Sequence, residues 1–124
     1  MHDTFTHWQL HRESSGIAIA TLDRAGESTN ALSQAVMTEL GQLLDQLEAS
    51  PPAGLIIRSG KAAGFIAGAN TEEFTAIDSA AAARVLVERG WNLFNRLAAV
   101  AYPTLALVRG HCMGGGFELA LACR

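Results

Sequence analysis

The sequence contains few of the residues and motifs on which metal, nucleotide and nucleic-acid sites depend. Its two cysteines, Cys112 and Cys123, form neither a CxxC pair nor a cysteine–histidine zinc spacing, so we predict free thiols and no metal site. Neither GxxxxGK[ST] nor GxGxxG occurs, so the nucleotide-binding motifs are not supported. The net charge is −3 and the basic residues are scattered. This charge distribution argues against a protein that binds nucleic acid through its phosphates.

Long apolar runs are also missing. The N-terminal stretch MHDTFTHWQLHRE has no apolar core of the kind that a secretory signal peptide needs. No apolar run reaches the roughly 18 residues that span a bilayer. Together with the free thiols, these absences predict a cytoplasmic protein without a membrane span. The 124 residues are 49% hydrophobic, which is enough for the core of one small domain.

Strand and helix patterns alternate along the chain. Apolar and polar residues alternate on both sides of the turn signal SSG within 6–24, which predicts two short strands. A helical pattern follows the cap residue Ser33 and stops at the prolines 51–52. The strand GLIIRSG, a helix capped by Asp78, the strand PTLALVRG and the apolar helix FELALACR come next. This order predicts an α/β fold with largely parallel strand pairing, in which the last helix is covered by more chain or by a partner.

Two of the predicted strands lead into glycine-rich loops. GLIIRSG leads to GFIAGAN, and TLALVRG leads to HCMGGGFE. Ligands of open α/β sheets lie at the carboxyl ends of strands, and glycine lets backbone N–H groups approach a ligand closely. The second loop also opens a helix, whose N-terminus favours negative charge. Two such loops side by side can aim two N–H groups at one oxygen and so form an oxyanion hole.

Glu118 lies one turn into the helix that follows the three glycines. Its neighbours are apolar, so we expect its carboxylate to be partly desolvated and suited to proton transfer in enolate chemistry. The pattern alone leaves other interpretations open. A GGG before a helix is often a tight turn or a packing point, and a first-turn glutamate often serves the helix dipole. We expect His111 to bond to backbone and Thr71 to cap a short helix that carries Glu72 and Glu73. Asn70, Glu72 and Glu73 are expected to line or cap a helix start.

FIAGANxxEF and VRGHCMGGGFELALAC, taken together, resemble the crotonase superfamily, which has the enoyl-CoA hydratase/isomerase fold. The segment IATLDRAGESTNALS is similar to the first strand and NAL loop of that family. Within the superfamily, the hydratase part of multifunctional fatty-acid oxidation α-subunits is the nearer likeness. The resemblance covers nearly the whole chain. It implies that residues 1–124 form the N-terminal portion of one crotonase-like ββα spiral, truncated before the second catalytic glutamate.

The resemblance also implies roles for individual residues. The two N–H groups that hold the thioester oxygen fall on Ala69 and Gly115, and the catalytic acid/base falls on Glu118. The positions that border the CoA part of the substrate are Arg24, Ala25, Ala67, Gly68, Asn70 and Gly114. Asn70 stands where the family usually has aspartate. Because that residue shapes the loop, we expect CoA binding to survive the change.

The implied activity is the addition of water to a 2-enoyl-CoA in fatty-acid β-oxidation, through an enolate held in the oxyanion hole. Coenzyme A enters as part of the substrate, and no separate cofactor or metal is implied. The second glutamate of hydratases lies beyond Arg124, so we predict that the chain alone is weak or inactive. The resemblance further implies a homo-oligomer, a trimer in many members, or a subunit of a complex. Two alternatives stay open: an isomerase or acyl-CoA hydrolase of the same superfamily, and a non-catalytic acyl-CoA-binding or assembly module.

Overall fold

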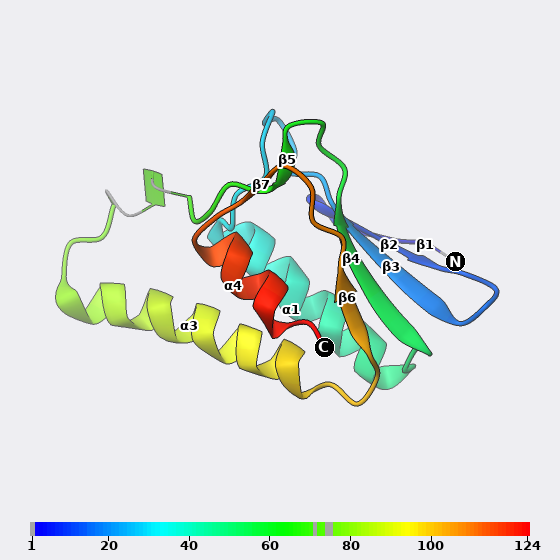
Figure 1. The fold of residues 1–124 in the computed structure, drawn as a ribbon. Coiled ribbons are helices and arrows are strands. Elements are labelled where there is room, and N and C mark those ends of the chain that lie inside the picture. The colour runs from blue at the N-terminus through cyan, green and yellow to red at the C-terminus, as the bar shows by residue number, and fades with distance from the viewer. Residues whose placement is uncertain (1, 71, 74–75) are drawn as a thin grey trace.

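The computed structural model describes residues 2–70, 72–73 and 76–124, which include a mixed sheet, a small second sheet, two long helices and a shorter C-terminal one (Figure 1). The elements, in chain order, are β1 (His2–Thr4), β2 (Trp8–Arg12), β3 (Ile17–Leu22), α1 (Gln34–Ala49), β4 (Gly54–Ser59), β5 (Gly64–Ile66), α3 (Ala80–Ala99), β6 (Thr104–Ala106), β7 (His111–Cys112) and α4 (Gly115–Ala122). The predicted α/β class is confirmed. None of the helices in the described ranges is long and apolar enough to cross a membrane.

The main sheet has the strand order β1-β2-β3-β4-β6. The pairs β1–β2 and β2–β3 are antiparallel, whereas β3–β4 and β4–β6 are parallel. The pairing is therefore mixed rather than largely parallel, because a tight turn at Gly16 joins β2 to β3 and allows only an antiparallel pair. A separate parallel pair, β5–β7, lies above α4 in Figure 1.

Helix α1 begins where the sequence predicts. The Val36 N–H donates to the Ser33 hydroxyl over 3.2 Å, which caps the helix. Alternate residues of β3 are buried, and they face the apolar side of α1. The core between this helix and the sheet consists of Trp8, Leu10, Ala18, Ala20, Leu22, Val36, Leu40, Leu43, Leu44, Leu47, Leu55 and Ile57. Burial of this stripe fixes the start of α1, which borders the candidate site.

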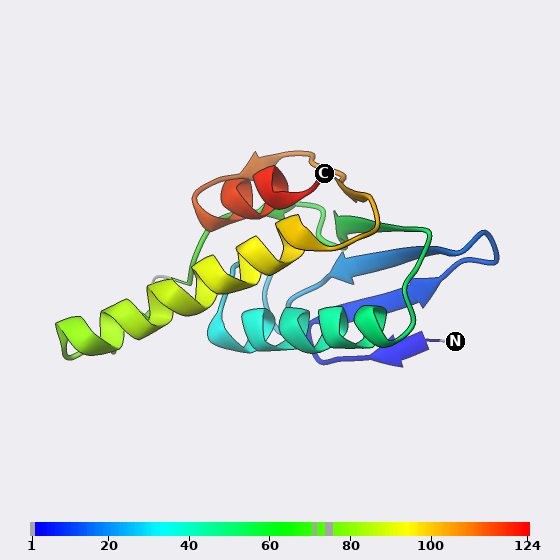
Figure 2. The same cartoon turned by 90° about the horizontal axis from the view of Figure 1, so that it is seen from below.

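Helix α3 begins one residue later than predicted. The Ala82 N–H donates to the Ser79 hydroxyl over 3.0 Å, so the cap is Ser79 and not Asp78. The cap side chain must lie three residues before its N–H donor, and Ser79 meets that spacing to Ala82. The N-terminal half of α3 extends past the sheet (Figure 2). Its C-terminal part is tied to α1, because Arg96 donates to the Gly41 carbonyl and pairs with Asp45 at 2.7 Å.

Candidate active site

The two glycine loops lie side by side, as the sequence predicts. Strands β5 and β7 pair in parallel, and the Met113 N–H donates to the Ile66 carbonyl over 3.1 Å. A Cβ atom at Gly114 would lie 3.8 Å from Gly68 Cα, so the two backbones are in contact where the loops turn. Gly68 and Gly114 both have positive φ, at 132° and 52°, which glycine adopts without strain. The short second sheet therefore brings two segments far apart in sequence to one place.

Backbone pairing orients the Ala69 N–H. Leu32 and Ala69 form a parallel bridge, and the Leu32 N–H donates to the Gly68 carbonyl over 2.8 Å. In this pattern the N–H of Ala69 points away from Leu32. Gly115 is the first residue of α4, where a backbone N–H has no acceptor within its own helix. Among the residues that the structure describes, neither N–H has a hydrogen-bond acceptor.

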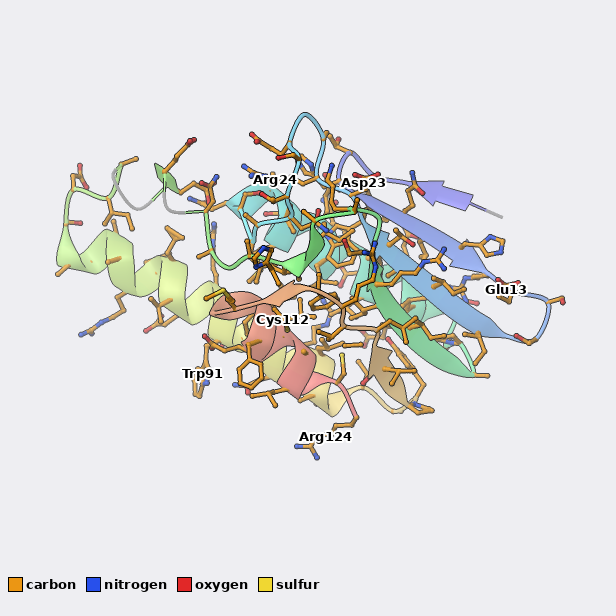
Figure 3. The ribbon with its side chains drawn as sticks, turned by 45° about the horizontal axis from the view of Figure 1, so that its top comes forward. Glu13, Asp23, Arg24, Trp91, Cys112 and Arg124 are labelled. Carbon is orange, nitrogen blue, oxygen red and sulfur yellow. The ribbon has the colours of Figure 1, made fainter. Side chains whose placement is uncertain are left out.

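A cavity of about 490 Å³ lies beside these two N–H groups. Ala69, Asn70, Gly115 and Glu118 line one part of it, and its apolar walls come from α1, α3 and the loop before α1. The apolar lining includes Leu32, Met37, Leu86, Val87, Leu93 and Phe94. Trp91, which also borders the cavity, projects from α3 and is 66% exposed (Figure 3). The site thus combines two N–H donors and a carboxylate with an apolar chamber.

Glu118 is exposed, so the prediction of a partly desolvated carboxylate is wrong. Helix α4 buries only Gly116 and Leu119, whereas Phe117 and Leu121 are 52% and 66% exposed. The apolar neighbours of Glu118 in sequence therefore do not enclose it. Its position still suits proton transfer, because it lies in the first turn of α4 and borders the same cavity as Ala69 and Gly115.

The third glycine of GGG is a packing point. A Cβ atom at Gly116 would lie 2.6 Å from Ile66 Cβ and 2.9 Å from the Ile66 carbonyl oxygen, which no real side chain tolerates. Gly116 therefore lets α4 press against β5. The packing interpretation applies to Gly116, while the N–H of the neighbouring Gly115 remains free to act as a donor.

The segment after Ala69 is held by two local caps. The Asn70 side-chain oxygen accepts from the Glu72 N–H, and the Asn70 carbonyl accepts from the Glu73 N–H, each over 3.1 Å. The Glu73 carboxylate in turn accepts from the Gln34 N–H, at 3.0 and 3.2 Å, at the start of α1. Asn70 thus caps this segment, as expected, whereas Glu73 caps α1 and not its own segment. The predicted cap Thr71 lies outside the described residues. The link from Glu73 to α1 was not predicted. The first N–H groups of a helix have no acceptor within the helix, so the start of α1 needs an acceptor from elsewhere, which Glu73 supplies.

Arg24 and Ala25 do not line the cavity. They lie on the loop between β3 and α1, which Figure 3 marks by Asp23 and Arg24. The Arg24 N–H donates to the Asn30 side-chain oxygen over 3.0 Å, and Ala25 N–H to His7 Nδ1 over 3.1 Å. Ala67, Gly68 and Gly114 likewise shape the backbone next to the cavity without lining it. The sequence analysis gave no role to Asn30, the asparagine of the NAL segment; the structure shows that it is buried, and a buried polar side chain needs hydrogen-bond partners.

The remaining candidates lie apart from this chemistry. His111 is an exposed residue of β7 that does not line the cavity. Cys112 and Cys123 are free thiols, as predicted, and both are partly buried and packed against the core. Burial raises the pKa of the Cys123 thiol, which disfavours a nucleophilic thiolate. Within the described ranges, no group of three or more histidine, cysteine or acidic residues is arranged to hold a metal.

Comparisons with known proteins agree with this geometry. Residues 12–124 match the family described as enoyl-CoA hydratase/isomerase. The fatty acid oxidation complex subunit alpha of Shewanella sp. (strain W3-18-1) is 40% identical over 99% of the chain, which spans 17% of that relative's length.

Two crystal structures share the fold. An enoyl-CoA hydratase/carnithine racemase from Magnetospirillum magneticum superposes with a TM-score of 0.88 at 29% identity, over 98% of this chain and 45% of that one. An enoyl-CoA hydratase/isomerase from Xanthobacter autotrophicus Py2 gives 0.87 at 31% identity, over 97% and 45%. The predicted crotonase resemblance is confirmed, and the chain belongs to the enoyl-CoA hydratase/isomerase family.

Proposed function

We propose that this chain carries the oxyanion hole and one acid/base of an enoyl-CoA hydratase-type enzyme of fatty-acid β-oxidation. The observation that supports this most directly is the shared cavity. Two backbone N–H groups without acceptors among the described residues, those of Ala69 and Gly115, border the same space as the Glu118 carboxylate. The apolar walls from α1 and α3 suit the hydrocarbon part of an acyl thioester.

In the proposed reaction, the thioester oxygen of a 2-enoyl-CoA accepts hydrogen bonds from Ala69 and Gly115. Water adds through its oxygen to C3 and gives up one proton to a carboxylate, while the displaced π electrons move to the thioester oxygen as an enolate. The two N–H donors stabilise that charge, and one such donor is worth about 3–4 kcal/mol in the transition state. Protonation at C2 completes the 3-hydroxyacyl-CoA. Glu118 is the group that we assign to proton transfer.

The test substitutes Glu118→Gln in the natural full-length protein. We expect kcat/KM for 2-enoyl-CoA hydration to fall by about 10²-fold or more, because the amide cannot exchange a proton. Binding of a saturated acyl-CoA should persist, since the substitution preserves shape. Glu88→Gln is the matched control, because Glu88 is an exposed helical glutamate outside the cavity lining. Full activity in Glu118→Gln would contradict the proposal and favour the non-catalytic acyl-CoA-binding or assembly module.

One observation favours an isomerase as the second candidate. Two glutamates border the cavity, and the carboxylate of Glu73 is already bonded to the Gln34 N–H. Among the described residues this leaves Glu118 as the cavity carboxylate available for proton transfer. A single base suffices to move a proton from C2 of a 3-enoyl-CoA to C4. Product analysis with 2-enoyl and 3-enoyl substrates separates the two activities; release of free CoA would instead indicate the hydrolase.

We further propose that the protein acts in the cytoplasm as an oligomer or as a subunit of a fatty-acid oxidation complex. The name of the 40% identical relative supports the complex, and the exposed apolar residues Phe117 and Leu121 offer a surface for assembly. The molar mass of the native protein in solution tests this proposal. A protein that is strictly monomeric at cellular concentration would contradict it.

A further inference from the structure

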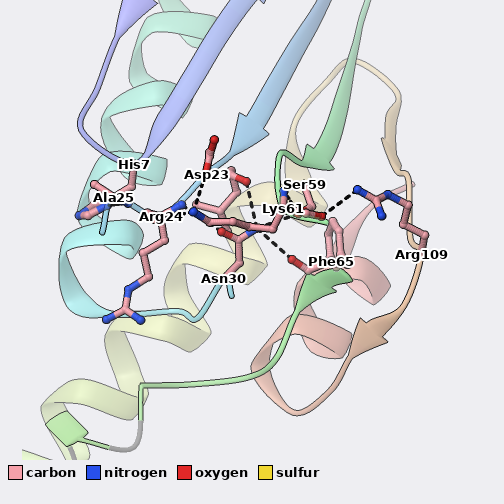
Figure 4. Close-up of polar contacts among 10 residues, drawn as sticks. His7, Asp23, Arg24, Ala25, Asn30, Ser59, Lys61, Phe65 and Arg109 are labelled. Atoms are coloured by element: carbon pink, nitrogen blue, oxygen red, sulfur yellow. Dashed lines mark hydrogen bonds and ion pairs between the residues drawn. The ribbon is translucent and has the colours of Figure 1, made fainter. Parts of the chain in front are cut away.

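Asn30 lies at the junction of the two loops that border the candidate site. Its side chain is 2% exposed and fully engaged (Figure 4). The Oδ1 atom accepts from the Arg24 N–H over 3.0 Å. The Nδ2 atom has three acceptors within reach: the Leu22 carbonyl at 2.9 Å, the Ser59 hydroxyl at 2.9 Å and the Phe65 carbonyl at 3.1 Å. One side chain therefore joins the ends of β3 and β4, the loop after β3, and β5.

The backbone around Asn30 holds the other loop directly. The Ala67 N–H donates to the Asn30 carbonyl over 2.9 Å, and the Leu32 N–H donates to the Gly68 carbonyl over 2.8 Å. Residues 30–32 thus act as a short strand against 67–69. This pairing sets the direction of the Ala69 N–H, so any shift of Asn30 is transmitted to that donor.

A neighbouring cation adds a second tie to the same loop. Lys61 pairs with Asp23 at 2.6 Å and donates to the Arg24 carbonyl over 2.8 Å. The Lys61 side chain is only 13% exposed, which makes this pair part of the packed structure. Asn30 therefore holds the N–H of Arg24, and Lys61 holds its carbonyl together with the Asp23 carboxylate.

We propose that Asn30 is a positioning residue: by tying the Arg24–Ala25 loop and the ends of β3 and β4 to β5, it holds the Ala69 N–H in the orientation that oxyanion stabilisation needs. The kinetic part of this proposal rests on the proposed function. An amide is required because Oδ1 meets an N–H donor while Nδ2 meets three oxygen acceptors. Aspartate has the same shape, but it would turn a carboxylate oxygen toward those three acceptors. The isosteric change therefore breaks the junction without creating a void.

The test compares Asn30→Asp with Arg96→Ala in the natural full-length protein. Arg96 joins α3 to α1 through several polar contacts and touches neither loop, so it controls for a loss of stability alone. We expect Asn30→Asp to lower kcat by about 10²-fold, the effect of displacing a catalytic group by about 1 Å. Arg96→Ala should leave kcat unchanged at a comparable loss of Tm.

Hydrogen exchange provides a readout that does not depend on activity. The amides of Leu32 and Ala67 should exchange at least about tenfold faster in Asn30→Asp than in Arg96→Ala, because their acceptors lie at the loosened junction. Equal exchange in the two variants would overturn the proposal. If the wild-type protein hydrates no enoyl-CoA, the proposed function fails, while exchange still decides the positioning role. If Asn30→Asp does not fold, Asn30→Ser replaces the amide by a shorter hydroxyl and adds no charge; unchanged exchange and kcat in that variant would also refute the proposal.

Discussion

Substitution of Gly116 by alanine tests whether the triple glycine sets the height of α4 above β5. The added Cβ atom would lie 2.6 Å from Ile66 Cβ, 2.8 Å from Ile66 Cγ2 and 2.9 Å from the Ile66 carbonyl oxygen. These atoms belong to a branch point and to the backbone of β5, so no simple rotamer change relieves the contact. We expect the free energy of unfolding to fall by about 1–3 kcal/mol, the usual cost of an overpacked core.

A second glycine in the chain provides the opposite expectation. Gly41 lies inside α1, and a Cβ atom there would meet only Leu93 Cδ1 at 3.9 Å, an ordinary contact. Gly41→Ala should therefore raise the free energy of unfolding by about 0.5–1 kcal/mol, because alanine is the better helix former. Denaturant unfolding of both variants measures the two values. The same substitution, glycine to alanine, must lower the free energy of unfolding at Gly116 and raise it at Gly41.

The functional consequence follows from the position of Gly116 in α4. To accept a Cβ atom the helix must move away from β5, and it carries Gly115 and Glu118 with it. We expect kcat/KM for enoyl-CoA to fall by about 10²-fold in Gly116→Ala, as for a 1 Å misplacement, and to stay unchanged in Gly41→Ala. A Gly116→Ala protein as stable and active as the wild type would refute the role assigned to the third glycine.

Two further substitutions test local features of the fold. Ser33→Ala removes the acceptor of the Val36 N–H and should lower the free energy of unfolding by about 1 kcal/mol in a denaturant titration; an unchanged midpoint would refute the cap. The Tyr102 hydroxyl is buried without a hydrogen-bond partner among the described residues, so Tyr102→Phe should be neutral or stabilising by up to about 1 kcal/mol at neutral pH. Burial raises the pKa of Tyr102, and the nearby charge of Arg96 opposes part of this rise. The stability that the neutral phenol contributes is therefore fully present below the ordinary pKa of tyrosine and is lost as the pH rises through the raised pKa of the folded protein. Thermal unfolding across the alkaline range should show a smaller loss for the phenylalanine variant, and an identical loss would contradict the assignment.

The sequence predicts the long elements well and misses the short strands β5 and β7. Helix α1 has 16 residues and buries five of them at helical spacing, so its period and its Ser33 cap were both readable. β5 and β7 have three and two residues, too few to show a period. They form because two backbones meet where glycine permits contact, as at Gly110, where a Cβ atom would lie 2.9 Å from Gly64 Cα. Such pairing depends on contacts between distant segments, which local patterns do not contain.

The sequence predicts where the glycine loops of the candidate site meet, but its prediction that Glu118 is partly buried is wrong. One physical difference explains both outcomes. Glycines and strand ends fix where N–H groups gather, and these are local properties of GFIAGAN and HCMGGGFE. Burial is not local: an apolar neighbour shields a carboxylate only if that neighbour faces a packed surface. In α4 the packed face holds Gly116 and Leu119, three residues apart, so Glu118 and its apolar neighbour Phe117 both stay exposed. The burial of a helical carboxylate therefore depends on which face of its helix packs, and the residues next to it in sequence do not determine that face.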